Sequence, residues 1–245
     1  MAGRHASVVQ IFAHEPELLE HVPTAEAEAA RHRTVVTSLS LPPGDITPPA
    51  VRSDPFDLGL LVLEGLLQRR VEAAGGRTVE LLGAGDLIRP WRDRAAARSV
   101  RVGQEWRIAE PTQLAVLDRR FEQEVARWPG VVAGLLERLA ARADALSIQL
   151  ALAQLPRLDA RLLFILWHIA DRFGRVGPEG VALPTLTQET LAEMTASRRP
   201  SVNGALARLR DRGLIAPGRP GQWFLLGEPE DAAEFARATP LVSLA

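Results

Sequence analysis

The sequence of 245 residues contains no cysteine, no tyrosine and no lysine, and only 5% of its residues are aromatic. Without cysteine the chain cannot form disulfides, use a thiolate nucleophile, or bind zinc or an iron–sulfur cluster through sulfur. No run of eighteen apolar residues occurs, so we expect no transmembrane helix and no membrane partner. The N-terminal apolar stretch is interrupted by His14-Glu15-Pro16 and is not expected to act as a secretory signal. From these absences we expect a cytoplasmic protein.

Patterns for catalysis and metal binding are also missing. Of the five histidines, none pairs with another at a metal-ligand spacing on a plausible helix, and His168 lies in an apolar helical stretch where a core or capping role is expected. The sequence has no Gly-rich phosphate loop and no nucleophile elbow. We therefore expect neither enzymatic activity nor a metal site. The five histidines are His5, His14, His21, His32 and His168.

Charge is distributed unevenly along a chain whose net charge is only −1. Residues 157–226 carry ten arginines against six acidic residues, whereas residues 1–156 carry eighteen against twenty. The tail from residue 227 has one arginine and four acidic residues. A basic segment on a nearly neutral chain suits a DNA-binding domain joined to a domain with another task. The length allows two modest domains.

Residues 186–215 (LTQETLAEMTASRRPSVNGALARLRDRGLI) have the pattern of two short helices joined by a tight turn. Thr187 is the expected N-cap of the first helix, and Ala196-Ser197 form the turn. The second helix is expected to begin near Arg199-Pro200, because proline suits a first helical turn. Its apolar residues recur on one face at helical spacing: Val202, Ala205, Leu206 and Leu209.

The opposite face of the second helix carries small or amide-bearing residues, with Arg199 at its leading end. Arginine can bond guanine through two nitrogens, and asparagine can pair with adenine. A helix-turn-helix presents its recognition helix to the major groove in this way, although an ordinary helical hairpin in a larger α domain fits the spacing equally well. The predicted DNA-contacting residues are Thr187, Gln188, Arg198, Arg199, Pro200, Ser201, Asn203, Gly204, Arg208 and Arg219.

A short hairpin is predicted directly after these helices. Gly213 is a suitable C-cap, and residues 217–221 (PGRPG) form a turn between Leu214-Ile215 and residues 222–226 (QWFLL). This is the wing of a winged helix. Arg219 at its tip either reaches a phosphate or is a solvated turn residue.

The motifs LTQExLAEM, RPSVNxALxRL and RGLI closely resemble the DNA-binding domain of the Crp/Fnr superfamily of bacterial transcription regulators. Residues 161–174 (RLLFILWHIADRFG) resemble the first helix of that domain. Together these motifs cover about a quarter of the chain. Arg198 departs from the family, which commonly has Ser or Thr there to cap the recognition helix. Either Ser197 takes over the cap or the helix starts one residue early.

The N-terminal half has the pattern of a compact β-roll or barrel, with many short strands between Gly and Pro turns. Residues 1–30 are expected to be helical or irregular. The expected strands are residues 34–41, 57–67, 68–71, 77–82, 99–107 and 112–118, with turns within or between them, among them 42–45, 75–76 and 83–86.

The family resemblance implies that this half is a cyclic-nucleotide-binding-type β-roll, and residues 79–86 (VELLGAGD) resemble it. Members that bind cAMP hold the ribose with the Glu of Gly-Glu and the phosphate with the Arg of Arg-Ser, about ten residues later. The matching positions here are Gly85, Asp86, Arg98 and Ser99. Asp is shorter than Glu and the intervening segment lacks the usual pattern, so a surface role fits Arg98 better. Trp91 and Trp106 either line a pocket or fill the core.

A dimerisation helix is predicted between the two domains. Residues 121–126 look like a short helix, and a longer one starts near Pro129 and ends at Pro156. Its apolar residues recur at spacings of four and three, which is a heptad seam. The seam favours a parallel two-stranded contact, and the alternative is packing on the chain's own β-domain. The seam residues are Val132, Leu136, Leu139, Ala143, Leu146, Leu150 and Ala153.

The sequence thus predicts an α+β protein: an N-terminal cyclic-nucleotide-binding-like β-roll, a long dimerisation helix and a C-terminal winged helix-turn-helix. The expected boundaries are 1–120, 121–156, 157–226 and an acidic tail, 227–245, which ends in a possible helix over 232–238. Such a protein would regulate transcription by binding a palindromic operator in double-stranded DNA as a homodimer. Further candidate partners are RNA polymerase and a small effector bound in the β-roll, for which a cyclic nucleotide is one candidate. The alternative is an effector-binding sensor or interaction dimer that acts through a protein partner.

Overall fold

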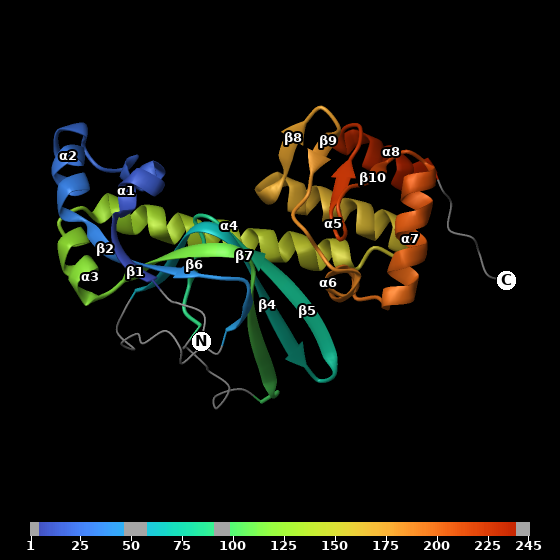
Figure 1. Cartoon of the computed structure of the whole chain (residues 1–245), viewed down its shortest axis with the longest axis horizontal. Coiled ribbons are helices and arrows are strands. Elements are labelled where there is room, and N and C mark those ends of the chain that lie inside the picture. Colours follow the sequence, from blue (N-terminus) through green and yellow to red (C-terminus); the bar gives the residue numbers. More distant parts are fainter. Residues whose placement is uncertain (1–4, 47–57, 91–98, 239–245) are drawn as a thin grey trace. The chain divides into compact units, whose positions relative to one another are not determined.

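A computed structural model of the chain describes residues 5–46, 58–90 and 99–238 (Figure 1). The chain divides into two compact units, residues 1–75 with 80–144 and residues 145–245 with the short segment 76–79. The predicted α+β class is confirmed, because the first unit is built on a rolled β-sheet and the second on helices with a small sheet. Among the described residues, no helix has both the length and the apolar character needed to cross a membrane.

Among the residues that the structure describes, seven strands form the sheet on which the first unit is built. Their order is β1-β2-β7-β4-β5, with β3 paired to β7 and β6 paired to β4. The predicted strands near residues 34–41 and 77–82 are confirmed as β2 and β5. The bounds are β1 His5–Gln10, β2 Val35–Leu41, β3 Gly44–Ile46, β4 Gly59–Ala73, β5 Gly76–Leu82, β6 Leu87–Ile88 and β7 Val102–Leu117.

Strands β4 and β7 are each continuous where the sequence predicted two strands, and both predictions of an interruption were wrong. The register between them shifts between Val62 and Leu67, which marks a β-bulge. Gly65 within the bulge has φ +96°, and a Cβ there would collide with the backbone oxygen of Pro111 in β7. Because the bulge lies opposite Pro111, β7 passes through a residue that cannot donate to the ladder.

Three smaller expectations for the first unit also need correction. Residues 5–10 of the N-terminal segment, expected to be helical or irregular, form β1, which pairs antiparallel with β2, whereas the helices that follow confirm the expectation. Gly44 and Asp45, expected in a turn, start β3. The turn between β4 and β5 is Ala74-Gly75, one residue earlier than predicted, and both residues have the positive φ that a tight hairpin turn requires.

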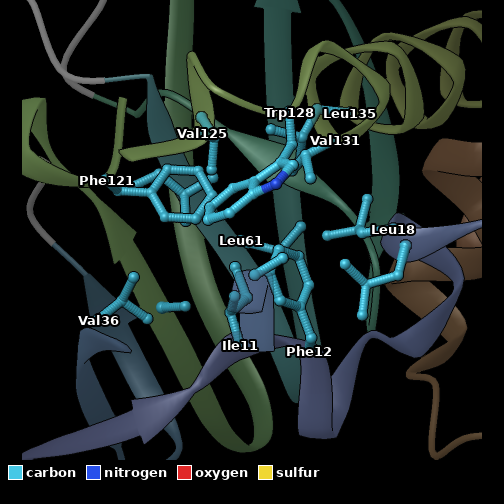
Figure 2. Packing of buried hydrophobic residues seen from close by; sticks show 14 of the residues in the cluster. Ile11, Phe12, Leu18, Val36, Leu61, Phe121, Val125, Trp128, Val131 and Leu135 are labelled. Atoms are coloured by element: carbon cyan, nitrogen blue, oxygen red, sulfur yellow. The ribbon is translucent and has the colours of Figure 1, made fainter. Parts of the chain in front are cut away.

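The first unit also contains α1 (Ile11–His14), η1 (Pro16–Leu19), α2 (Thr24–Arg33), the predicted short helix α3 (Arg119–Val125) and the start of the predicted long helix α4 (Pro129–Ala153). Figure 2 shows the cluster that joins them to the sheet, with Phe12, Trp128 and Leu135 packed around Leu61 of β4. The neighbouring Leu60 points to the opposite face and belongs to the core inside the roll. Trp106 also lies there and is 5% exposed, so it fills the core.

The second unit holds the predicted three helices and wing. They are α5 (Leu158–Phe173), α6 (Gln188–Met194), α7 (Arg199–Asp211), β10 (Ile215–Pro217) and β11 (Trp223–Leu225). A second hairpin, β8 (Arg175–Gly177) and β9 (Gly180–Ala182), was not predicted, and it extends the wing into a sheet of order β10-β11-β9-β8. The C-terminal helix α8 (Pro229–Ala238) starts three residues earlier than expected.

Candidate nucleic-acid interface

Helix α6 and its turn are fixed by local hydrogen bonds. Thr187 is the N-cap, as predicted, and its Oγ1 accepts a bond of 3.0 Å from the backbone N–H of Thr190. At the other end, Thr195 donates from Oγ1 to the Leu191 carbonyl at 2.7 Å. Ala196 then adopts φ 47°, a left-handed conformation that reverses the chain towards α7. The tight turn of the predicted helix-turn-helix is therefore present.

Arg161 of α5 anchors this turn, and sequence reasoning missed it. Its Nη1 donates to the Thr195 carbonyl at 2.6 Å, while Nε and Nη2 donate to the Leu155 carbonyl at 2.8 and 2.6 Å. One guanidinium thus holds two carbonyls, that of Leu155 between α4 and α5 and that of Thr195 in the turn before α7. The position of α7 relative to α5 is fixed by this contact as well as by the apolar core.

The predicted division of α7 into two faces is confirmed. Its apolar residues are at most 2% exposed, and they are those predicted: Val202, Ala205, Leu206 and Leu209. The other face is open, with Arg199, Pro200 and Asn203 exposed and Gly204 and Ala207 partly exposed. Gly204 and Ala207 are small, so another surface can approach the helix backbone closely there.

Neither predicted way of capping α7 is used. The helix starts at Arg199, with Arg198 in the N-cap position and no side-chain bond from it. Ser197 donates from Oγ to the Thr195 carbonyl at 3.1 Å and so does not cap. The positive end of the helix dipole consequently has no side-chain cap, and it can favour an anion.

Two of the predicted DNA-contacting residues of α7, Arg199 and Arg208, differ in their polar partners. Arg199 donates from Nε to Gln188 Oε1 at 3.4 Å, a weak contact between two predicted residues. Arg208, in contrast, is held by Asp159 of α5 through two bonds, of 2.9 Å from Nε and 2.6 Å from Nη2. Hydrogen bonding to Arg208 lowers the pKa of Asp159 below its usual range. No pattern in the sequence indicated a role for Asp159.

The wing has the predicted form. The Gly218 N–H donates to the Gln222 carbonyl at 3.0 Å, and the Gln222 N–H donates to the Arg219 carbonyl at 2.8 Å. Both bonds close the turn between β10 and β11. Arg219 is exposed at its tip, where it is available to a phosphate.

Helix α8 of the acidic tail packs within the second unit, a question that sequence reasoning left open. Phe235 of α8 is 9% exposed, and its ring contacts two guanidinium groups, that of Arg157 at 5.2 Å and that of Arg212 at 4.8 Å. Arg157 precedes α5, and Arg212 follows α7. The aromatic ring of α8 therefore joins the start of one helix to the end of the other.

Two of the β-roll positions predicted for an effector, Gly85 and Asp86, make contacts within the chain. Asp86 is 3% exposed, and its Oδ2 accepts a 2.8 Å bond from the Gly83 N–H within its own turn. Gly85 lies against the Arg138 guanidinium, Ser99 is exposed, and Arg98 and Trp91 lie outside the described residues.

Another buried carboxylate of the first unit, Glu80, is bonded to two arginines. Its two oxygens accept bonds of 2.6 and 3.0 Å from Arg142 of α4, and Arg69 contacts it at 2.8 Å. The apolar cavity inside the roll measures about 10 Å³, room for one water molecule at most. This cavity is too small for a cyclic nucleotide.

The predicted dimer seam on α4 is largely uncovered within one chain. Leu136, Leu139 and Leu150 are 60%, 40% and 64% exposed, and Val132 is 37% exposed. Leu146 and Ala153 are partly exposed, and Ala143 is exposed. The residues of α4 that pack on the β-roll side are different ones, including Val131 and Leu135. Packing on the chain's own β-domain therefore uses another face of the helix.

Comparison with known proteins identifies the domain that contains the helix-turn-helix. Residues 160–229 match the model of the Crp-like helix-turn-helix domain. No curated protein matches the chain in sequence. Among the solved structures that it resembles is a CRP-family transcriptional regulator from Thermus thermophilus, with 22% identity, a TM-score of 0.57, and coverage of 82% of this chain and 97% of that one.

Two further similar structures are more distant in sequence. FixK2 from Bradyrhizobium japonicum is 15% identical, with a TM-score of 0.60 and coverage of 81% and 96% of the two chains. A cyclic nucleotide-binding domain containing protein from Listeria monocytogenes is 14% identical, with a TM-score of 0.62 and coverage of 88% and 97%. These likenesses extend over both units and show a shared fold.

Proposed function

We propose that this chain is a transcription regulator of the Crp/Fnr superfamily that binds a palindromic operator as a homodimer, with α7 reading bases in the major groove. The observation that carries the proposal is the exposed face of α7, where small residues adjoin Arg199 on a helix whose opposite face is buried. A recognition helix needs this combination of close approach and a leading donor group.

The dimer is proposed to form through the α4 seam. Four large apolar side chains on one side of a helix, each more than one-third exposed, are costly in water and are removed from it when two α4 helices pair. Two copies of α7 would then contact successive major grooves of the same DNA face. Such a protein acts by binding rather than catalysis, and it works in the cytoplasm, where the DNA is. RNA polymerase remains a further candidate partner.

The wing and the helix termini are proposed to contact the DNA backbone. Arg219 at the wing tip and Arg198 before α7 are exposed cations, and the N-terminus of α7 adds the positive end of its dipole. Phosphate contacts of this kind set the position of the protein on the duplex, while base contacts give sequence preference. Gln188 and Thr187 at the start of α6 complete the proposed surface.

The test is selection of bound sequences from a random DNA pool by the full-length chain, with and without cAMP and cGMP. We expect a palindrome whose half-sites lie about one helical turn apart, enriched equally with and without nucleotide. No enrichment under any condition would overturn the proposal. It would favour the alternative, a sensor or interaction dimer that acts through a protein partner.

A further inference from the structure

Arg208 lies along α7 with its guanidinium turned back over the previous turn of the helix. Long helical side chains point towards the N-terminus, so Arg208 covers the position four residues earlier, Gly204. A Cβ at Gly204 would lie only 3.3 Å from Arg208 Nη1. The other two nitrogens, Nε and Nη2, are bonded to Asp159. One nitrogen is therefore directed to the open face of α7 while two are held by a carboxylate.

The position of Asp159 favours its bonds to Arg208. It lies in the first turn of α5, where the helix dipole favours a negative charge, and its side chain is 17% exposed. Arg208 and the nearby Arg157 and Arg212 all lower the pKa of the Asp159 carboxyl, so it remains ionised at neutral pH. A bidentate arginine–carboxylate pair is also geometrically specific.

We propose that Asp159 is a specificity-determining residue, which acts by neutralising and orienting Arg208. The inference rests on the proposed function, since it needs DNA against the exposed face of α7. A lone arginine at this place would bind any phosphate in reach and strengthen binding to all sequences. Paired with Asp159, Arg208 carries little net charge and presents Nη1 in one direction, so it contributes only where the DNA has an acceptor there.

Arg199 on the same helix gives the contrast. Its Nε donates a weak bond of 3.4 Å to the side chain of Gln188, which is neutral, so Arg199 keeps its full charge. The recognition helix thus carries one arginine, Arg199, without a carboxylate partner among the described residues, and one, Arg208, whose attraction to DNA is restricted by a carboxylate from another helix.

The experiment measures the dissociation constants of the wild type and the Asp159→Asn variant for the selected operator and for a random duplex, across a range of salt concentrations. Each phosphate contact contributes about 0.9 to the slope of log affinity against log salt. We expect Asp159→Asn to bind random DNA more tightly and to steepen that slope by about 0.9. The ratio of operator to random affinity should fall by about fivefold or more, the loss of one directed contact.

Two controls separate this effect from a change in net charge. Asp45→Asn removes one carboxylate from an exposed pair with Arg107 in the β-roll, and we expect it to change neither slope nor ratio. Arg208→Gln should lower the ratio and leave the slope unchanged in the wild type, but should reverse the steeper slope in the Asp159→Asn background.

Several outcomes would overturn the inference. One is an Asp159→Asn variant with a native circular dichroism spectrum and an unchanged slope and ratio. Another is an equal loss of affinity on both DNAs. If Asp159→Asn fails to fold, Arg208→Gln alone decides, because a slope shallower by about 0.9 would show that Arg208 binds phosphate despite its partner. A wild type without sequence preference would instead refute the proposed function.

Discussion

At the residue scale, Arg199 is the side chain on which base reading is expected to depend most. Replacing it with alanine should cost about 1–3 kcal/mol on the selected operator and less on random DNA, because a bidentate contact to guanine is lost. Arg199→Lys keeps the charge but cannot make that contact, so it should behave like alanine on the operator. Fluorescence anisotropy with both duplexes measures this, and an equal loss on both would contradict a base-reading role.

His168 gives a prediction about pH. Burial lowers the pKa of His168 below its usual value, although its hydrogen bond of 3.1 Å to the Ala145 carbonyl opposes this shift. The unfolded chain therefore binds a proton more readily than the folded one, and stability should fall as pH drops through the ordinary histidine pKa, about 6.5. Urea unfolding at neutral and mildly acidic pH should show a smaller acid loss for His168→Gln than for the wild type. Identical acid losses would show that His168 does not contribute.

The sequence predicted the role of a residue where the residues next to it in the chain indicate that role. The open face of α7 follows from helical spacing, and Thr187 as a cap follows from its place before an apolar run. Asp159 and Arg161 were missed because their partners, Arg208 and Thr195, lie 49 and 34 residues away. A long-range pair between polar side chains leaves no periodic pattern in a single sequence.

At the element scale, the α4 seam is expected to hold two chains together. Leu139→Glu with Leu146→Glu would place a pair of carboxylates in the contact and break the dimer, because buried unpaired charges are strongly unfavourable. Light scattering measures the mass in solution. Ala141→Glu with Ala151→Glu adds the same charge to exposed α4 positions outside the seam and should leave the dimer intact. If the first double variant were still dimeric, the seam would be wrongly placed.

All of α8 except its first residue lies beyond the segment that matches the Crp-like domain model, yet the helix is part of the packed unit. Phe235→Ala should destabilise that unit by about 3–5 kcal/mol, the usual cost of removing a buried phenyl group. Phe235→Leu keeps apolar volume but loses the two cation–π contacts, each worth about 0.5–1 kcal/mol, and should cost less. Thermal unfolding checks both. If the alanine variant melts like the wild type, α8 does not stabilise the unit.

Element boundaries were predicted well where the signals are local and poorly where they depend on pairing. Helices α3, α4, α6 and α7 begin close to the predicted residues because caps and prolines mark them. The continuity of β7 through Pro111 could not be predicted, since it depends on a bulge in β4 that lies opposite. The hairpin of β8 and β9 has strands of only three residues, too short for alternation to be visible.

At the scale of the whole molecule, α4 has two tasks on different faces. Its exposed seam is available to a second chain, while Arg142 bonds Glu80 of β5 and the Leu87 carbonyl at 2.9 Å. Arg138 similarly bonds Glu15 at 2.7 Å. The helix proposed to make the dimer is thus fixed to its β-roll by internal charges.

Removing one member of the Arg142–Glu80 pair should therefore destabilise the protein more than replacing both members with apolar residues. Arg142→Met alone leaves Glu80, 5% exposed, with half of its partners removed, and should destabilise the first unit by about 3–5 kcal/mol. Adding Glu80→Leu removes the stranded charge, so the double variant should regain much of that loss. Urea unfolding of both single variants and the double variant gives the coupling as a double-mutant cycle. Additive losses would mean that the two charges do not stabilise each other, and that apolar packing alone holds α4 to the β-roll.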